Sequence, residues 1–268
     1  MSFAAASPVP LGTADSYAVL AGSAITNTGP TTITGDVGLH PGSAVTGFGS
    51  VTLNGALHVA DAAAEQAKND LVTAYNTAVG SGPATEIATE LGGEILTAGV
   101  YDSASGTFEI TGTLTLDAEG DPDAVFVFQM DSTLVTHTSS IVTIINAGQA
   151  CNVFWQVGSS ATLGTTTTFR GNILALTSIT LVTGATVEGS VLARNGAVTL
   201  DSNTITRAVC DVPPTTTTTT TLGPPETGGG STSGFQYGPL LLIGGALLVA
   251  GGAAFAIRRR MDRPGSRR

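Results

Sequence analysis

Histidines, cysteines and clustered carboxylates are the residues of this sequence that could carry catalysis or bind a metal. The histidines have no second ligand at the short spacings that metal sites use; they are His40, His58 and His137. The sequence also lacks a nucleophile elbow, a phosphate-binding glycine loop and a Cys/His pairing. We therefore expect no catalytic residues, no metal site and no cofactor, and we assign the histidines surface or structural roles.

Four carboxylates alternate in the segment DAEGDPD; they are Asp117, Glu119, Asp121 and Asp123. Alternate carboxylates could hold a weakly bound Ca²⁺, but the segment lacks the pattern of the 12-residue calcium loop. We interpret it as a solvated turn.

Cys151 and Cys210 bracket the most repetitive part of the chain. In an exported protein they would form a disulfide, which would stabilise the fold by roughly 4 kcal/mol in the chain-entropy model. Two buried free thiols are the alternative. The features of the C-terminus described below favour export and therefore the disulfide.

Charge is distributed unevenly along the chain. Residues 1–212 contain four basic and 18 acidic side chains, a net charge of −14, whereas the last eleven residues contain six arginines. Binding to nucleic acid needs clustered cations that face the phosphates, so the sequence argues against a nucleic-acid partner. The acidity most simply serves solubility.

The elements that must position any site are short β-strands, because residues 152–205 repeat. Val153, Ile173 and Val191 begin matching segments, at steps of 20 and 18 residues. Each step contains three pieces rich in Val, Ile, Thr or aromatic residues, with Gly or Ser between them. A repeat of about 20 residues with three strands is typical of one coil of a β-solenoid.

Alternation in the middle strand of each coil predicts which side chains point inward. Ile179 and Leu181 alternate with Ser178 and Thr180, so the apolar set should form the interior and the hydroxyl set the outer wall. Similar strands are expected in residues 11–57 and again from Gly99 to the repeat.

One amphipathic helix is expected over residues 57–78. Its narrow apolar stripe has steps of three or four residues and consists of Leu57, Ala60, Ala64, Ala67, Leu71, Ala74 and Ala78. Such a stripe can lie close against a sheet. The strands that contain VFWQV, ILALT and VLARN are apolar on both sides, so they are the expected platform and Trp155 is expected in the core. Residues 79–96 are expected to form a loop with a short helical turn.

The composition changes sharply after the repeat. Residues 213–237 are rich in Thr, Pro and Gly, cannot form a core and predict an extended stalk. Residues 238–257 are apolar, and the 19 residues 239–257 would span about 28 Å as a helix, close to the roughly 30 Å core of a bilayer. Residues 258–268 are basic and predict a cytoplasmic tail, which leaves residues 11–212, the predicted solenoid, outside the cell.

The N-terminus has neither the charged region nor the long apolar run of a signal peptide. Residues 1–10 are interpreted as disordered or as the remnant of a cleaved leader.

Two long segments, residues 96–130 and 151–205, closely resemble the microbial ice-binding (antifreeze) proteins, which were long catalogued as a domain of unknown function. The resemblance covers about residues 11–211. It implies a mainly β fold, a discontinuous β-solenoid of triangular cross-section with one long α-helix packed along a face. It also implies that a second, flat face is the ice-binding surface.

The resemblance indicates which residues would contact ice, because several members carry Thr-Ala/Gly-x-Thr/Asn on that face. Residues 183–186 and 28–31 fit this motif, residues 165–168 depart from it at the second position, and residues 201–204 fit poorly. The candidate contacts are Thr28, Thr31, Thr165, Thr168, Thr183, Thr186 and Thr204.

A competing threonine face comes from the outward side chains of the middle strands. Its members are Ser160, Thr162, Ser178, Thr180 and Thr199. Arg170 and Glu188 are expected to flank each other on adjacent coils, where they would either border the binding face or interrupt it.

The C-terminus resembles a sortase sorting signal, with Pro-Pro-Glu-Thr-Gly at residues 224–228 before the apolar span and the arginines. The usual motif begins Leu-Pro, and Pro224 stands where Leu is expected. A sortase that accepted the motif would cleave between Thr227 and Gly228 and attach the protein to the cell wall. Otherwise the span would remain as a membrane anchor.

These patterns together predict a non-enzymatic, surface-anchored protein that adsorbs to ice through a flat, threonine-rich face. The alternative is a cell-surface adhesin that binds polysaccharide or protein. Exposed aromatic residues on one face would favour the adhesin, whereas a charge-free threonine plane would favour ice. A polysaccharide-active enzyme would need paired carboxylates that converge on a groove, and the sequence shows none.

Overall fold

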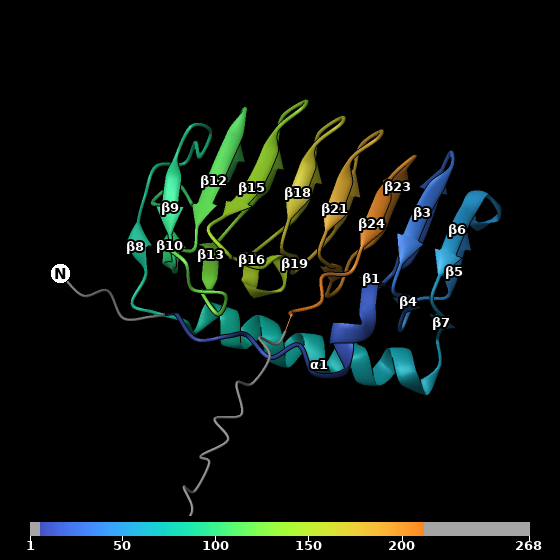
Figure 1. Cartoon of the computed structure of the whole chain (residues 1–268). Coiled ribbons are helices and arrows are strands. Elements are labelled where there is room, and N and C mark those ends of the chain that lie inside the picture. Colours follow the sequence, from blue (N-terminus) through green and yellow to red (C-terminus); the bar gives the residue numbers. More distant parts are fainter. Residues whose placement is uncertain (1–5, 212–268) are drawn as a thin grey trace, which may run out of the picture. The chain divides into compact units, whose positions relative to one another are not determined.

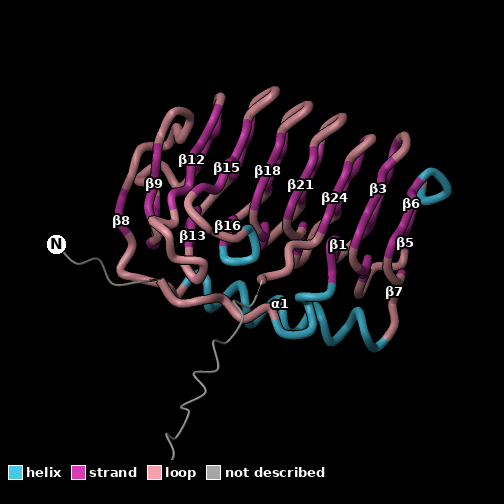
Figure 2. The backbone as a smooth tube through the Cα atoms, viewed as in Figure 1, coloured by secondary structure: helices cyan, strands magenta, loops and turns pink. Residues whose placement is uncertain are grey.

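The computed structural model describes residues 6–211, which form three parallel β-sheets and one long α-helix (Figures 1 and 2). Each sheet forms one side of a three-sided coil, and each complete turn of the coil adds one strand to each sheet. The predicted mainly β architecture with one long helix is confirmed for these residues.

The spatial order of the strands differs from their order in the sequence. Across sheet A it runs β7 (Leu57–Val59), β4 (Asp36–Leu39), β1 (Tyr17–Ala21), β22 (Val191–Ala193), β19 (Asn172–Ala175), β16 (Val153–Val157), β13 (Phe126–Met130), β10 (Gly99–Asp102) and β8 (Thr85–Glu86). Across sheet B it runs β11 (Phe108–Ile110), β14 (Leu134–Thr136), β17 (Ala161–Leu163), β20 (Ile179–Leu181), β23 (Val198–Asp201), β2 (Ala24–Thr28) and β5 (Ala44–Thr46). Across sheet C it runs β6 (Val51–Asn54), β3 (Thr31–Thr34), β24 (Thr204–Thr206), β21 (Thr186–Glu188), β18 (Thr168–Arg170), β15 (Ile141–Ile145), β12 (Thr113–Asp117) and β9 (Ile95–Thr97). Short 3-10 helices are η1 (Gly12–Ser16), η2 (Phe48–Ser50) and η3 (Ala150–Asn152).

The coils likewise do not stack in the order of the sequence. The last coil (β22, β23 and β24) pairs with the preceding coil on one side and with the first coil (β1, β2 and β3) on the other. Val19 thus pairs with Val191, and Thr32 with Thr204. The chain therefore starts inside the stack, builds toward one end, crosses to the opposite end and returns (Figure 1).

The crossing is made by α1 (Ala62–Val79), which packs along the outer side of sheet A. Its 18 residues span about 27 Å, close to the roughly 29 Å covered by the six strand spacings from β4 to β10. The helix is therefore long enough to carry the chain along most of the stack. Its buried residues are Ala64, Ala67, Lys68, Leu71, Ala74, Tyr75 and Ala78.

The helix begins later than its periodicity predicted. Leu57 lies in β7, where its side chain is exposed and the strand pairs with β4. Asp61 caps the helix, since its Oδ1 accepts a hydrogen bond of 2.8 Å from the Ala64 N–H. The edge of sheet A offers backbone partners to residues 57–59, which a helix that starts there would forgo. Residues 79–96 contain β8 and the start of β9 instead of the predicted helical turn.

Apolar side chains form two layers. Inside the coil, Trp155 stacks on Phe128 with ring centroids 4.0 Å apart, and its Nε1 donates to the Arg170 carbonyl at 3.1 Å. The predicted core position of Trp155 is confirmed, as are the inward directions of Ile179 and Leu181. Phe154 lies on the other side of sheet A and joins the second layer, beneath α1. The central strands of sheet A are therefore buried on both sides.

No helix within residues 6–211 is both long enough and apolar enough to cross a bilayer. The predicted stalk, membrane span and sortase-like motif lie outside the described residues.

Candidate functional site

The outer sides of sheets B and C face solvent, whereas α1 covers sheet A (Figure 1). We call these two surfaces face B and face C. Because neighbouring strands are parallel and in register, equivalent side chains form columns along the stack, with a repeat of about 4.8 Å. The side chains in these columns decide what each face can bind.

The central column of face B contains five threonines on five adjacent coils. Its members are Thr162, Thr180, Thr199, Thr26 and Thr46. The column continues through Val135 to Glu109, which Glu90 joins through an isolated bridge. Within the described residues, the hydroxyls of Thr162, Thr180 and Thr199 have no hydrogen-bond partner in the protein, so they are available to water.

The serines of face B are committed to the wall of the coil. Ser160 Oγ accepts from the Ser178 N–H at 3.3 Å and lies 2.9 Å from Thr177 Oγ1. Ser178 Oγ accepts from the Ala197 N–H at 3.2 Å. These two members of the predicted competing face therefore stabilise the turn between sheets A and B, and the threonines are the freer groups.

Face C has a longer but interrupted array. Its first column contains Thr52, Thr32, Thr204, Thr186, Thr168, Ile141 and Thr113, all exposed. Its second column contains Asn54, Thr34, Thr206, Glu188 and Arg170. The predicted juxtaposition of Arg170 and Glu188 is confirmed, with Nε 3.3 Å from Oε2. This ion pair places two charges near the middle of face C.

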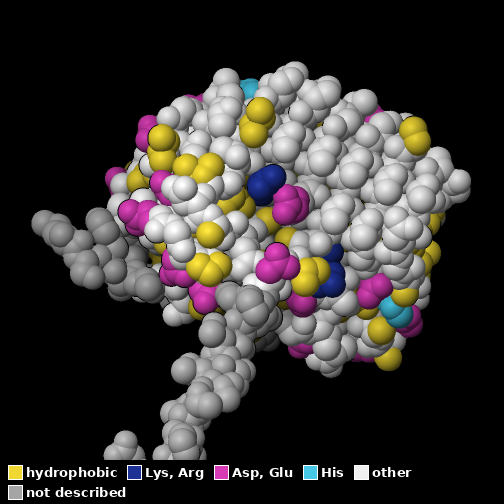
Figure 3. Space-filling model, viewed as in Figure 1, with side chains coloured by type: hydrophobic (Ala, Val, Ile, Leu, Met, Phe, Trp, Pro, Cys, Tyr) yellow, Lys and Arg dark blue, Asp and Glu magenta, His cyan; other side chains and the backbone are white. Residues whose placement is uncertain are grey.

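Figure 3 shows how hydrophobic, charged and other side chains are distributed over the side of the molecule that includes face C. Uncharged polar side chains and backbone dominate the region of β24, β3 and β6. Hydrophobic and acidic side chains gather toward β8 and β9. Face C is therefore asymmetric along the stack.

The residues of the predicted threonine motif do not lie on one face. Thr168, Thr186 and Thr204 belong to the first column of face C. Thr28 ends β2, and Thr165 and Thr183 lie in turns between sheets B and C. The Thr183 hydroxyl donates to the carboxylate of Asp201, so that hydroxyl already has a partner.

The assignment of Thr31 to an outward face is wrong. Its side chain is 1% exposed; the hydroxyl donates to Asn27 Oδ1 at 2.6 Å and accepts from the Asn203 N–H at 3.1 Å. The residue in register with Thr204 and Thr186 is Thr32. A shift of one residue along a strand exchanges the inward and outward sides, which explains the error.

The remaining candidates for chemistry are dispersed. Within residues 6–211, no group of three His, Cys, Asp or Glu side chains is placed to hold a metal ion. His58 lies 2.8 Å from the Asp61 carboxylate and His137 lies 3.5 Å from that of Glu109. In the acidic loop, Asp117 Oδ1 accepts from Asn146 Nδ2 at 2.7 Å and from a backbone N–H, and these bonds lower the pKa of Asp117.

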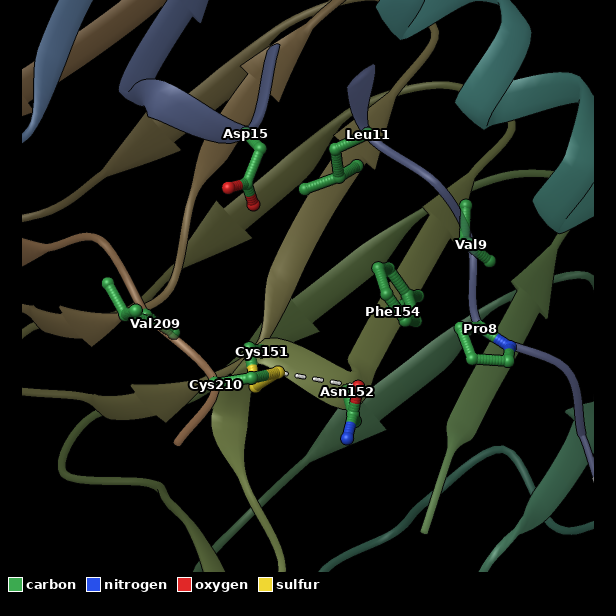
Figure 4. A pocket seen from close by; sticks show the side chains of 10 residues that line it. Pro8, Val9, Leu11, Asp15, Cys151, Asn152, Phe154, Val209 and Cys210 are labelled. Carbon is green, nitrogen blue, oxygen red and sulfur yellow. Dashed lines mark hydrogen bonds between the residues drawn. A yellow bond between two sulfur atoms is a disulfide. The ribbon is translucent and has the colours of Figure 1, made fainter. Parts of the chain in front are cut away.

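The predicted disulfide between Cys151 and Cys210 is confirmed. It borders a hollow of about 320 Å³ between the N-terminal segment and η3, shown in Figure 4. Leu11, Val9 and Phe154 give this hollow an apolar lining. It has no cluster of groups suited to catalysis.

Lys68 is the buried cation beneath α1. Its ammonium donates to the carbonyl oxygens of Ala193 and Arg194, which end β22 and begin the next turn. Burial, and to a smaller extent the Arg194 guanidinium, lowers the pKa of Lys68 to about 7. Arg194 in turn lies over the Tyr75 ring, 4.7 Å from its centroid. These contacts join the helix to the last coil.

Sequence reasoning missed the threonines of the first two coils. Thr26 and Thr46 complete the column of face B, and Thr32, Thr34 and Thr52 complete that of face C. Alternation within TTIT (residues 31–34) and AVT (residues 44–46) is the signal that could have indicated these threonines. Their columns became visible only once the first coil was known to pair with the last.

Comparisons with known proteins agree with this architecture. The family model described as "Ice-binding-like" matches residues 19–206. An ice-binding protein of Nostoc sp. (strain HG1) is 51% identical over 211 residues, which are 78% of each chain. One of Colwellia sp. is 37% identical over 213 residues, 74% of this chain and 83% of that one.

Solved structures show the same relationship. An ice-binding protein from an Antarctic biological consortium has a TM-score of 0.76 and 47% identity, covering 78% of this chain and 95% of that one. An ice-binding protein of Antarctomyces psychrotrophicus has a TM-score of 0.72 and 41% identity, covering 76% and 100%. The resemblance drawn from the sequence is thus confirmed: this chain belongs to the ice-binding-like family.

Proposed function

We propose that this protein binds the surface of ice crystals and that face B makes the contact. The observation that carries the proposal is the threonine column from Thr162 to Thr46. It runs over five adjacent coils, and no charged residue interrupts it. Its relatives named as ice-binding proteins support the same activity.

The chemistry of ice explains why such a column suits it. Ice presents neither net charge nor a unique functional group, so its partner must match it by regular spacing. Each threonine offers a methyl group that sheds water and a hydroxyl that hydrogen-bonds to it. Because each contact is weak, many must form at once on a rigid plane, where little entropy is lost on binding. A sheet with full backbone pairing provides that plane.

Face B is preferred to face C because of charge. A charged side chain keeps its own hydration shell, and its burial against ice would cost free energy. Arg170 and Glu188 occupy neighbouring positions on face C. On face B, Glu109 stands at the far end of the column and Asp201 at the turn toward sheet C, so both charges border the threonines.

We assign different roles to the sequence candidates. Thr162, Thr180 and Thr199 are the principal contacts, joined by Thr26 and Thr46. Thr28, Thr165 and Thr183 border the plane at the turns toward sheet C. Ser160 and Ser178 support its opposite edge, at the turns between sheets A and B. Thr168, Thr186 and Thr204 belong to the neighbouring face.

The two other functions raised by the sequence have less support. The large hydrophobic side chains that are exposed within residues 6–211 are all aliphatic, whereas a sugar-binding adhesin would present aromatic rings. The family relationship favours a non-enzymatic protein.

We also propose that the ice-binding part is held at the cell surface. The support is the sequence alone: a Thr/Pro/Gly-rich stalk over residues 213–237, an apolar span over 238–257 and a basic tail over 258–268. The span would anchor the chain in the membrane unless a sortase cleaves between Thr227 and Gly228. Cell fractionation with and without sortase would separate these outcomes.

A matched pair of variants tests the binding face. Thr180 and Thr186 lie in the same coil, one on face B and one on face C. Thr180→Tyr should reduce thermal hysteresis of the full-length protein to below about one fifth, because a bulky ring at the centre of the plane prevents simultaneous contact. Thr186→Tyr, with the same change in bulk, should retain most of the hysteresis.

Circular dichroism of both variants controls for folding. Loss of hysteresis in Thr186→Tyr alone would move the face to sheet C. A wild-type protein with no hysteresis and no effect on crystal shape would contradict ice binding itself.

A further inference from the structure

The strands of face C at one end of the stack carry a second ordered set of threonines. β3 and β24 both present Thr-Ile-Thr, with the isoleucines buried inside the coil. Thr204 aligns with Thr32, and Thr206 aligns with Thr34. Both columns continue into β6, where Thr52 and Asn54 occupy the same positions. Sequence patterns did not reveal this set, because its strands come from opposite ends of the folded part.

The geometry of this set is two-dimensional. Neighbouring strands repeat at about 4.8 Å, and outward residues along a strand repeat at about 6.6 Å. The central column of face B, by contrast, repeats in one direction only. The six side chains therefore offer a small lattice of hydroxyl and amide groups.

The side chains of this lattice are free to meet an external partner. All six are exposed. Among the described residues, the hydroxyls of Thr32, Thr52, Thr204 and Thr206 have no hydrogen-bond partner in the protein. Thr34 Oγ1 accepts one long bond, of 3.4 Å, from Asn54 Nδ2. These hydroxyls must therefore hydrogen-bond to water or to a ligand that replaces it.

Charges border the lattice without entering it. Glu188 is the next residue of the second column beyond Thr206 and forms the ion pair with Arg170. On another border, Arg207 pairs with Asp15 at 3.2 Å. Residues 41–57, which include β5 and β6, contain no charged side chain. The region of β24, β3 and β6 is correspondingly free of charge in Figure 3.

We infer that β6, β3 and β24 form a second ice-contact site on face C, on a different side of the coil from face B. This inference rests on the proposed function. Two contact sites on different sides cannot both lie flat on one crystal plane at the same time. Because the face C set repeats in two directions and the face B column in one, each site should match its own family of planes. The protein can then also bridge an edge where two planes meet.

Variants on one column test the second site. Thr204→Tyr places a ring within the lattice, and Thr113→Tyr places the same ring on the first column of face C beyond the ion pair. The measurement is the pattern of planes bound by fluorescently labelled full-length protein on a single-crystal ice hemisphere. Wild type should label two families of planes. Thr180→Tyr and Thr204→Tyr should each lose a different family, and the double variant should lose both. Thr113→Tyr should match wild type.

The outcomes separate the two proposals. Wild-type protein that leaves the hemisphere unlabelled overturns the proposed function. Labelling by Thr204→Tyr that equals wild type overturns the second site alone, as does complete loss of labelling in Thr180→Tyr. Thr32→Tyr replaces Thr204→Tyr if the latter loses its native circular dichroism spectrum.

Replacing the ion pair tests the inference in the opposite direction. Arg170→Thr with Glu188→Thr would extend the second column by two coils, beside Thr186 and Thr168 of the first column, and would remove both charges. If the lattice contacts ice, this double variant should label the second family of planes at lower protein concentration than wild type. Unchanged or weaker labelling of that family would contradict the inference.

Discussion

Lys68 shows how one side chain can couple the stability of the molecule to pH. It is the only lysine of the sequence, and it is buried where α1 crosses the end of β22. Two backbone carbonyls accept its hydrogen bonds. The helix and the last coil are thereby joined by a group whose charge is costly to bury.

We predict that the free energy of unfolding rises with pH between about 7 and 10. Because the folded-state pKa of Lys68 is about 7 and the ordinary value is 10.5, the unfolded chain binds more protons in this window. The rise has an upper bound of about 1.4 kcal/mol per pH unit. The contribution of Lys68 to the free energy of unfolding should fall as pH falls toward 7. Below pH 7 Lys68 is protonated in both states, so this contribution should change no further.

Urea unfolding of wild type and Lys68→Met at four pH values checks this prediction. Methionine fills a similar volume without a charge, so the variant should show a flatter profile. Parallel profiles for the two proteins would assign the pH dependence to other groups.

The inward or outward direction of a side chain was predicted well where alternation along a strand decided it. It was predicted poorly where the number of residues in the preceding turn decided it. Ile179 and Leu181 follow from period two alone. Thr31 was assigned by a four-residue motif that is out of register with Thr186 by one position. A motif match cannot reveal how many residues a turn uses, and one residue reverses the face.

At the scale of elements, α1 depends on its first turn. The Asp61 carboxylate accepts the Ala64 N–H and also contacts His58, and these bonds lower the pKa of Asp61. An N-terminal cap of this kind satisfies a backbone donor that the helix itself leaves unpaired.

Asp61→Ala should lower the free energy of unfolding, because it removes the acceptor of a helix-terminal N–H. Glu65→Ala is the matched control, because it removes a carboxylate from the same first turn without removing the cap. Urea unfolding at pH 7 measures both. Equal effects of the two substitutions would mean that charge at the helix terminus, and not the hydrogen bond, carries the contribution.

The sequence predicted which elements exist better than where they begin. The alanine stripe identified α1 correctly from Ala64 to Ala78. Its start was misplaced because Leu57 and Ala60 fit the same period, although residues 57–59 pair with β4. Local periodicity contains no information about a distant strand that offers its edge.

At the scale of the whole molecule, the disulfide encloses the three coils of the repeat. Cys151 and Cys210 are separated by 59 residues, and the intervening chain contains β16 to β24. Closing such a loop in the unfolded chain corresponds to roughly 4 kcal/mol. The covalent bond therefore acts on the coils that carry three of the five threonines of the face B column.

Replacement of both cysteines by serine should lower the melting temperature by about 10 °C, given two to four degrees per kcal/mol for a domain of this size. Thermal hysteresis near the freezing point should survive, because the threonine columns do not use the disulfide. Differential scanning calorimetry and hysteresis of the same preparation check both statements. Loss of hysteresis in a variant that is still folded would show that the bond also shapes the binding face.

The general architecture could be predicted because each coil repeats a local pattern. The order of the coils could not be worked out from residue patterns, since Val19 and Val191 are paired by the fold and not by proximity in the sequence; the family resemblance implied only that the solenoid is discontinuous. The ice-contact columns depend on that pairing. This is why the threonines of β2, β3, β5 and β6 were missing from the predicted site.

The position of the last coil has a consequence for the timing of synthesis. A ribosome releases β1, β2 and β3 long before β22, β23 and β24, the coil against which they must pair. Until β22, β23 and β24 have left the ribosome, one edge of the first coil has no neighbour, and the two halves of the stack cannot join. We therefore expect the complete stack to form only after residue 206 has emerged, and that edge of the first coil to stay unpaired until then.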